Sequence, residues 1–170
     1  MLKRRVFMDF QEFLHKSKTN GYAGSAKPKI LADGGFQIEI QEGRFVYRDT
    51  WETFARNREV AGREEASSSG REWEMGYVGR LYSEFKPTRN MRIIDVYNFL
   101  REALRHAPKN APFRGPKKFS KGRLSYECVW TGNLEHFRGV EYLLLDGEKI
   151  HRLSFEGGFK DRTVKDYLPA

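Results

Sequence analysis

The chain contains one pattern of glycine and aromatic residues twice, and this repetition limits its possible folds more than any other feature. The pattern is present as Gly43, Tyr47 and Trp51 and again, at the same internal spacing, as Gly122, Tyr126 and Trp130. The distance between the two copies varies only where turns are expected, and turns tolerate insertions. Two long copies are too few for a solenoid, which needs three or more short units. The sequence therefore predicts one duplicated domain, residues 1–170, with repeat halves at about 7–82 and 93–160.

Each half begins with a predicted helix. Asp9 and Glu12 have the spacing of a capping box, which predicts a helix from about Phe10 to Lys18. In the second half, Asp95 is the expected N-cap of a helix whose apolar stripe ends before Pro108. Segments of alternating apolar and polar residues follow each helix, separated by turn residues, as in antiparallel hairpins. We predict an α+β fold with a two-fold internal repeat, in which each half is one helix followed by a four-stranded antiparallel sheet.

The composition indicates a folded, basic domain without disulfides. The chain is 39% apolar and carries a net charge of +8, which fits a domain with a hydrophobic core. The single cysteine, Cys128, cannot form an intramolecular disulfide, and its position in a predicted strand favours a buried thiol. Polar residues interrupt the apolar stretch after the basic N-terminus, and no long apolar segment follows. We therefore expect a soluble cytoplasmic protein with no membrane partner.

The repeated aromatic residues favour a binding site. Residues two apart in a strand share a face, so Tyr47, Asp49 and Trp51 project together, as do Tyr126 and Trp130. These rings either fill the core or border a cleft between the halves, and an aromatic cleft is typical of small-molecule sites. We interpret the chain as a non-enzymatic module that binds a small molecule or a peptide, with its oligomeric state open. The predicted ligand-binding residues are Tyr47, Arg48, Asp49, Trp51, Tyr126 and Trp130.

A basic connector favours nucleic acid as an alternative partner. Residues 101–123 contain eight Lys or Arg residues and one acidic residue. Such residues gain affinity for nucleic acid by releasing counterions, and the interleaved Phe113 and Phe119 can stack on bases. A solvated basic face that keeps the protein soluble is the other interpretation. The residues expected to contact nucleic acid are Arg114, Lys117, Lys118 and Lys121.

The sequence contains none of the common motifs of catalytic or cofactor sites. It lacks a phosphate-binding loop, a dinucleotide fingerprint and a nucleophile elbow, and its four histidines do not have the spacing of zinc ligands. We therefore expect no metal, no cofactor and no catalytic residues. An enzyme with an acidic site near Asp49 and Glu64 is the second alternative, because burial among aromatic residues raises the pKa of a carboxyl group.

Six short motifs resemble those of a known domain family. They are Tyr22-Ala-Gly24, Tyr47-Arg-Asp49-Thr50, Gly62-Arg-Glu64, Trp73-Glu-Met75-Gly-Tyr77-Val-Gly79, Pro112-Phe-Arg-Gly115-Pro116 and Phe155-Glu-Gly157-Gly158. The family that they resemble is a prokaryotic domain family of unknown function, and the resemblance spans about Phe7 to Lys160. Its members occur alone or C-terminal to the helix-turn-helix of transcription regulators. The resemblance implies no catalytic residues, and it implies no reading of DNA for this chain, which lacks a leading helix-turn-helix.

Overall fold

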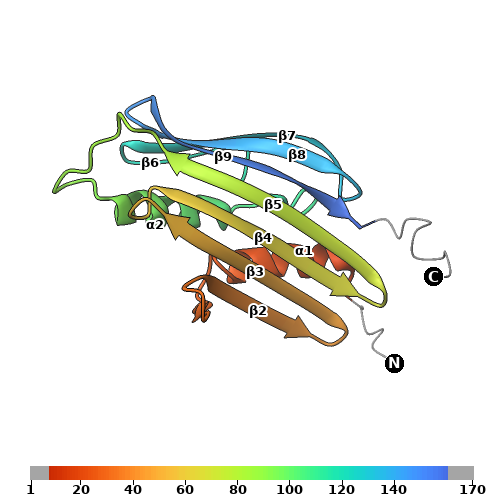
Figure 1. Cartoon of the computed structure of the whole chain (residues 1–170). Helices are drawn as coiled ribbons and strands as arrows, with labels where there is room; N and C mark the ends of the chain where they lie inside the picture. The colour runs from red at the N-terminus through yellow and green to blue at the C-terminus, as the bar shows by residue number, and fades with distance from the viewer. Residues whose placement is uncertain (1–7, 161–170) are drawn as a thin grey trace, which may run out of the picture.

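The computed structural model describes residues 8–160 of the chain. In this part of the chain, nine β-strands form a single antiparallel sheet in the order β1-β2-β3-β4-β5-β9-β8-β7-β6, and two helices lie on one face of the sheet (Figure 1). Neither helix in these residues is long and apolar enough to cross a membrane. The elements in chain order are α1 (Phe10–Asn20), β1 (Lys29–Ile30), β2 (Phe36–Glu42), β3 (Phe45–Phe54), β4 (Glu59–Ser68), β5 (Arg71–Leu81), α2 (Ile93–Leu104), β6 (Lys118–Lys121), β7 (Leu124–Gly132), β8 (Phe137–Leu145) and β9 (Glu148–Phe159).

Helix α1 begins where its capping residues predict. The Asp9 carboxylate accepts a hydrogen bond of 2.7 Å from the backbone N–H of Glu12, which satisfies a donor that the first helical turn leaves free. Phe13 is fully buried, and its ring stacks on Phe45 of β3 with the ring centroids 4.9 Å apart. The predicted helix is therefore confirmed, it continues to Asn20, and its apolar face holds it against the sheet.

Helix α2 begins earlier than the sequence pattern predicts. The N-cap is Arg92, and the predicted cap, Asp95, lies in the first helical turn. Asp95 instead accepts a hydrogen bond of 2.8 Å from the backbone N–H of Arg92. It also forms an ion pair with the Arg92 side chain. A carboxylate in the first turn also complements the positive end of the helix dipole. The helix then packs on the sheet through its buried apolar stripe, which includes Phe99 and Leu100.

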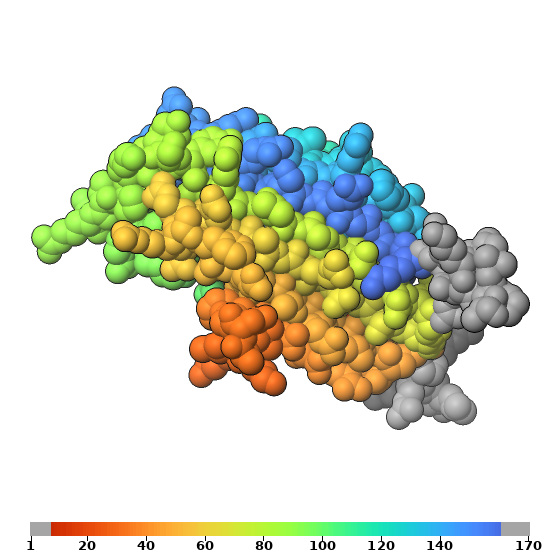
Figure 2. All heavy atoms as spheres, in the orientation of Figure 1, coloured from red at the N-terminus to blue at the C-terminus, as the bar shows by residue number. Residues whose placement is uncertain are grey.

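The predicted two-fold repeat of one helix and a four-stranded sheet is wrong, because all the strands belong to one sheet. Strands β5 and β9 pair with each other along their length, from Trp73 opposite Phe159 to Leu81 opposite His151. Figure 2 shows them as adjacent bands, β5 in green and β9 in blue. Two separate sheets would each leave a row of unpaired N–H and C=O groups on the last strand. Joining the two edges satisfies these groups, so a continuous sheet is the more stable arrangement.

Glycines allow aromatic rings to lie across the buried face of the sheet. Gly62 of β4 is paired with Trp51 of β3 on one side and with Tyr77 of β5 on the other. A Cβ atom at Gly62 would lie 2.3 Å from the Tyr77 ring, so only glycine leaves room for this ring. The ring crosses β4 at this point, and its hydroxyl reaches Asp49 on β3. The glycine thus positions a polar group that is central to the site described below.

We expect Gly62→Ala to destabilise the fold by on the order of 1–3 kcal/mol, the usual cost of overpacking a core. The added methyl group would displace the Tyr77 ring. The matched control is Gly76→Ala on the neighbouring strand, since a Cβ atom there would meet nothing within 4 Å. Urea unfolding of the two variants measures the difference. Equal stability of both variants would contradict this explanation of the glycine.

Candidate functional site

A cavity of about 420 Å³ lies between the helices and the buried face of the first strands of the sheet. Helix α2 and strand β3 contribute more lining residues than any other elements, and the segment after α1 closes one side. The aromatic residues that line it are Tyr22, Phe36, Tyr47, Trp51, Tyr77 and Tyr97. The charged residues that line it are Lys18, Asp49, Arg56, Glu64, Arg101 and Arg114. The cavity thus combines aromatic walls with a group of charged side chains.

Trp51 is the centre of the aromatic wall. The Tyr22 ring meets it edge to face with the ring centroids 5.6 Å apart, and the Phe36 ring stacks on it at 5.6 Å. On the opposite side of the cavity, the Tyr97 hydroxyl of α2 donates a hydrogen bond of 2.9 Å to the backbone carbonyl of Asn57. Burial raises the pKa of Tyr97 to about 12. These rings are therefore neutral and held in place by their neighbours, as the wall of a binding site requires.

Asp49 is one of two acidic residues that line the cavity, with Glu64, and it is only 3% exposed. The Tyr77 hydroxyl donates a hydrogen bond of 2.7 Å to its Oδ1 atom. Among the residues that the structure describes, no group donates a hydrogen bond to the other oxygen, Oδ2. Burial, and after it the charge of Glu64 on the next strand, together raise the pKa of Asp49 from 3.8 to about 7. Asp49 thus has a free acceptor atom and titrates near neutral pH.

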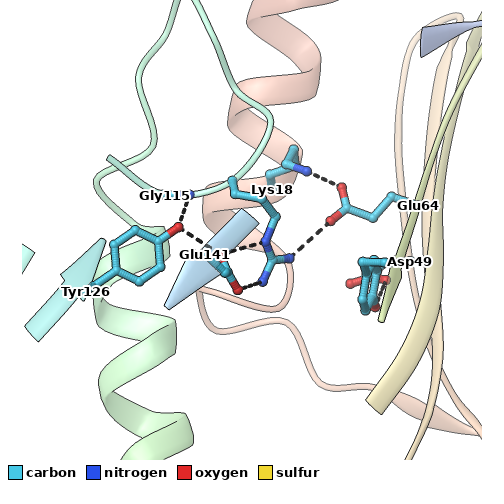
Figure 3. A network of polar contacts seen from close by, with 8 residues as sticks. Lys18, Asp49, Glu64, Gly115, Tyr126 and Glu141 are labelled. Atoms are coloured by element: carbon cyan, nitrogen blue, oxygen red, sulfur yellow. Dashed lines mark hydrogen bonds and ion pairs between the residues drawn. The ribbon is translucent and has the colours of Figure 1, made fainter. Parts of the chain in front are cut away.

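A network of buried ion pairs lies beside Asp49 (Figure 3). Lys18 of α1 forms an ion pair and hydrogen bond with Glu64 of β4. The Arg114 guanidinium lies 3.8 Å from the Glu64 carboxylate and donates two hydrogen bonds, of 2.6 and 3.0 Å, to Glu141 of β8. The Tyr126 hydroxyl donates a further bond of 2.7 Å to Glu141. The network therefore connects α1, the segment after α2 and both halves of the sheet, through β4 and β8.

The network contains one more acid than base. Its cations are Lys18 and Arg114, and its carboxylates are Glu64, Glu141 and Asp49. Burial alone would raise the pKa of Glu141, but Arg114 and its hydrogen bonds lower that pKa below its ordinary value. Burial lowers the pKa of Lys18, and the Glu64 carboxylate opposes this shift only in part. Each cation thus has a carboxylate partner, and Asp49 forms no ion pair with any residue that the structure describes.

The structure brings together three of the six predicted ligand-binding residues. Tyr47, Asp49 and Trp51 line the cavity from the inward-facing side of β3. Arg48 lies on the opposite face of the sheet, where it pairs with Glu39. Tyr126 and Trp130 do not line this cavity. Tyr126 belongs to the buried network, and Trp130 packs edge to face against Phe113.

The predicted nucleic-acid residues fall into two environments. The Arg114 side chain is only 7% exposed and belongs to the buried network, so it is not available to a phosphate group. Lys117, Lys118 and Lys121 are exposed. Lys121 forms an ion pair of 2.9 Å with Glu102, and Lys117 lies over the Trp130 ring at 5.9 Å. The structure therefore removes one of the four residues from the proposed surface.

The cysteine lies in the core of the domain. Cys128 is buried, as predicted, and burial raises the pKa of its thiol to about 12, so the thiol stays protonated at neutral pH. Within residues 8–160, no group of three or more His, Cys, Asp or Glu side chains is arranged to hold a metal ion.

Several residues of the cavity were not identified from the sequence. Lys18 carried a usable signal, because it follows the buried Leu14 by one helical turn and therefore lies on the same face of α1. Tyr22 carried a weaker signal in its motif with Gly24. Arg101 carried none, because nothing in the sequence brings α2 onto the first half of the sheet.

The comparisons with known proteins identify a domain family. A family model described as a domain of unknown function, DUF5680, matches residues 52–160, which is more than half of the chain. The match includes β4, β5 and the whole second half of the sheet, and it begins within β3, after Trp51. Searches of curated proteins and of solved structures found no match.

We expect Arg114→Leu to destabilise the fold by about 3–5 kcal/mol, the usual cost of leaving buried charges without their partner. In this variant, the buried carboxylates of Glu141 and Glu64 would both lose their interaction with the guanidinium. Arg123→Leu is the control, because its ion pair with Asp146 is exposed and should contribute little. Thermal and urea unfolding measure both variants. A loss for Arg114→Leu no larger than that for Arg123→Leu would show that the network does not stabilise the fold.

We expect Asp49→Asn to change how stability depends on pH. The pKa of Asp49 is higher in the folded state, about 7, than in the unfolded state, 3.8. The contribution of Asp49 to the free energy of unfolding is therefore fully present below pH 3.8 and is lost as pH rises through about 7. The variant does not suffer this loss, so its stability relative to the parent protein should increase by on the order of 2–4 kcal/mol across that range. Urea unfolding at a series of pH values tests this. The exposed Glu39→Gln is the control, and a pH-independent difference for Asp49→Asn would refute the buried ionisation.

Proposed function

We propose a function from the cavity alone, because the chain belongs to the DUF5680 family, whose function is unknown. The protein binds a small organic molecule in the cavity between α2, the segment after α1 and strand β3. The observation that carries this proposal is Asp49, which lines the cavity together with aromatic rings and whose Oδ2 atom accepts no hydrogen bond from residues 8–160. Ligand sites typically combine apolar walls with a few polar groups that orient the bound molecule.

The size of the cavity supports this proposal. Ligand pockets are commonly about 300–1,000 Å³, and this cavity has a volume of about 420 Å³. Protein interiors are packed as densely as organic crystals and cavities in them destabilise the fold, so a ligand that fills the inner part of this cavity would add stabilising contacts. The small residue Ala23 lies at this cavity, where a larger side chain would occupy part of the space.

The charge arrangement also supports a binding site. A buried carboxyl group without a counter-ion costs free energy, and it shifts its pKa instead of ionising fully. Asp49 has such a shift, to about 7. Ionisable groups with strongly shifted pKa values that line a cavity are characteristic of functional sites.

Acid–base catalysis in the same cavity is a second candidate. A group whose pKa is close to neutral can both donate and accept a proton at physiological pH, and Asp49 with a pKa of about 7 meets this condition. The two candidates share the cavity and differ only in whether the bound molecule is converted. Mass spectrometry of a ligand recovered after incubation distinguishes them.

The nucleic-acid interpretation has less support. Arg114 is buried in the ion-pair network, and Lys121 is paired with Glu102. Of the four predicted contact residues, Lys117 and Lys118 are the two that are exposed and form no ion pair within residues 8–160, so half of the predicted set supports this interpretation.

We expect small molecules that bind to quench the fluorescence of Trp51, because its ring forms the cavity wall. Screening a chemical library by tryptophan emission should yield compounds whose signal disappears in Trp51→Phe and remains in the control Trp130→Phe. Trp130 is the matched control because it lies outside the cavity on β7.

A second pair of variants shows that these compounds occupy the cavity. Thr53 lines the cavity and is exposed, so Thr53→Phe should obstruct it without disturbing the core. Its neighbour Glu52 faces the opposite side of β3, so Glu52→Phe should leave binding unchanged. A library without any such compound, or compounds that bind equally to Thr53→Phe, would contradict the proposal.

A further inference from the structure

The carboxyl group of Asp49 in the cavity has no hydrogen bond from a charged donor within residues 8–160. The two buried cations, Lys18 and Arg114, form their hydrogen bonds with Glu64 and Glu141 and none with Asp49. The only described donor to Asp49 is the Tyr77 hydroxyl, which is a neutral group because burial raises the pKa of Tyr77 well above its usual range. A ligand in the cavity is therefore the group that can complete the charge balance.

The geometry at Asp49 favours a donor from the cavity. Tyr77 occupies Oδ1 from the β5 side, and Lys18 approaches from α1 but donates to Glu64. Oδ2 has no donor among the described residues, although the side chain is almost completely buried and lines the cavity. A charged N–H group is the strongest partner for a carboxylate oxygen, because such hydrogen bonds are about twice as strong as neutral ones.

The walls of the cavity suit the same ligand. Trp51, Tyr22 and Phe36 form a continuous aromatic cluster, and Tyr97 faces the cavity from α2. The faces of aromatic rings attract cations, and the attraction is larger where water is excluded. An acid at the base and aromatic rings around it form the usual environment for a bound ammonium group.

We propose that the molecule bound in this cavity is an organic amine, whose ammonium group pairs with Oδ2 of Asp49 and whose apolar body packs against Trp51 and Tyr22. This inference rests on the proposed function and specifies the chemical class of its ligand. Binding requires Asp49 to be ionised, so an amine bound at neutral pH displaces the proton that Asp49 carries for part of the time.

The remaining charged residues limit which other functional groups the amine can carry. Arg56 and Arg101 also line the cavity, and Arg101 lies over the Tyr22 ring with 4.7 Å between the guanidinium and the ring centroid. The Nε atom of Arg101 has no hydrogen-bond partner within the described residues. These positive charges disfavour a second cationic group, so the end of the ligand near α2 is neutral or acidic.

Three probes with the same phenylethyl group test the inference: 2-phenylethylamine, 2-phenylethanol and 3-phenylpropionate. Isothermal titration and ligand-observed NMR above pH 7, where Asp49 is ionised, measure their affinities. We expect the amine to bind more tightly than the alcohol by on the order of tenfold or more, the effect of one desolvated charge pair, and the carboxylate to bind most weakly. Asp49→Asn should remove the preference for the amine and retain binding of the alcohol.

The pH dependence provides a second measurement. Affinity for the amine should fall as pH decreases below about 7, because protons then compete for Asp49, whereas affinity for the alcohol should stay constant. Glu39→Gln is the control variant, since this carboxylate is exposed on the other face of the sheet. Titrations in buffers of different ionisation enthalpy should show release of a proton on binding of the amine.

The outcomes separate this inference from the proposed function. An amine that binds no more tightly than the alcohol, or that keeps its preference in Asp49→Asn, overturns the inference. Binding of none of the three probes overturns it as well. In each case, library compounds that lose their binding in Thr53→Phe would still support a small-molecule site.

Discussion

The buried guanidinium of Arg114 is the interaction on which the rest of the structure depends. It lies between Glu64 on β4 and Glu141 on β8, two strands that are separated in the sheet by β5 and β9. Through Glu64 it is also connected to Lys18 on α1. One side chain from the segment after α2 therefore connects the two halves of the sheet with the first helix. A planar group with five donors is suited to this role, because it can bind two carboxylates at once.

The same constraint explains why Asp49 is available to a ligand. Lys18 and Arg114 bind the glutamates, so Asp49, which lies next to Glu64 on β3, has only the Tyr77 hydroxyl as a donor within the described part of the chain. Burial, and after it the like charge of Glu64 on the neighbouring strand, raises the pKa of Asp49. The residues that stabilise the fold and the residue that is proposed to bind the amine are thus parts of a single balance of charge.

Local features of the fold could be predicted from the sequence, and long-range ones could not. The cap at Asp9 and the alternation in β3 are short-range signals, and both correspond to the observed elements. The pairing of β5 with β9 depends on which strand edges meet, and the pattern of side chains within a strand does not encode this. The error about two separate sheets arose here.

The site was predicted in part for the same reason. Tyr47, Asp49 and Trp51 share one strand, so their common orientation follows from the two-residue period. Arg114 appeared in the sequence as one residue of a basic surface segment, and its burial follows only from the position of Glu141 in the folded chain. A charge count along the sequence cannot distinguish a solvated arginine from one with two buried carboxylate partners.

The central position of the β5 and β9 pair also affects how the chain reaches its native state. These strands lie in the middle of the sheet, yet α2 and three other strands separate them in the sequence. Contacts between residues so distant in sequence form slowly, because the entropy of closing a long loop is lost before the contacts stabilise the fold. During synthesis, the edge of β5 is exposed until β9 leaves the ribosome, and an open edge can pair with another chain. The protein therefore has a period of vulnerability to aggregation that is set by the order of its strands and ends only when the last strand is added.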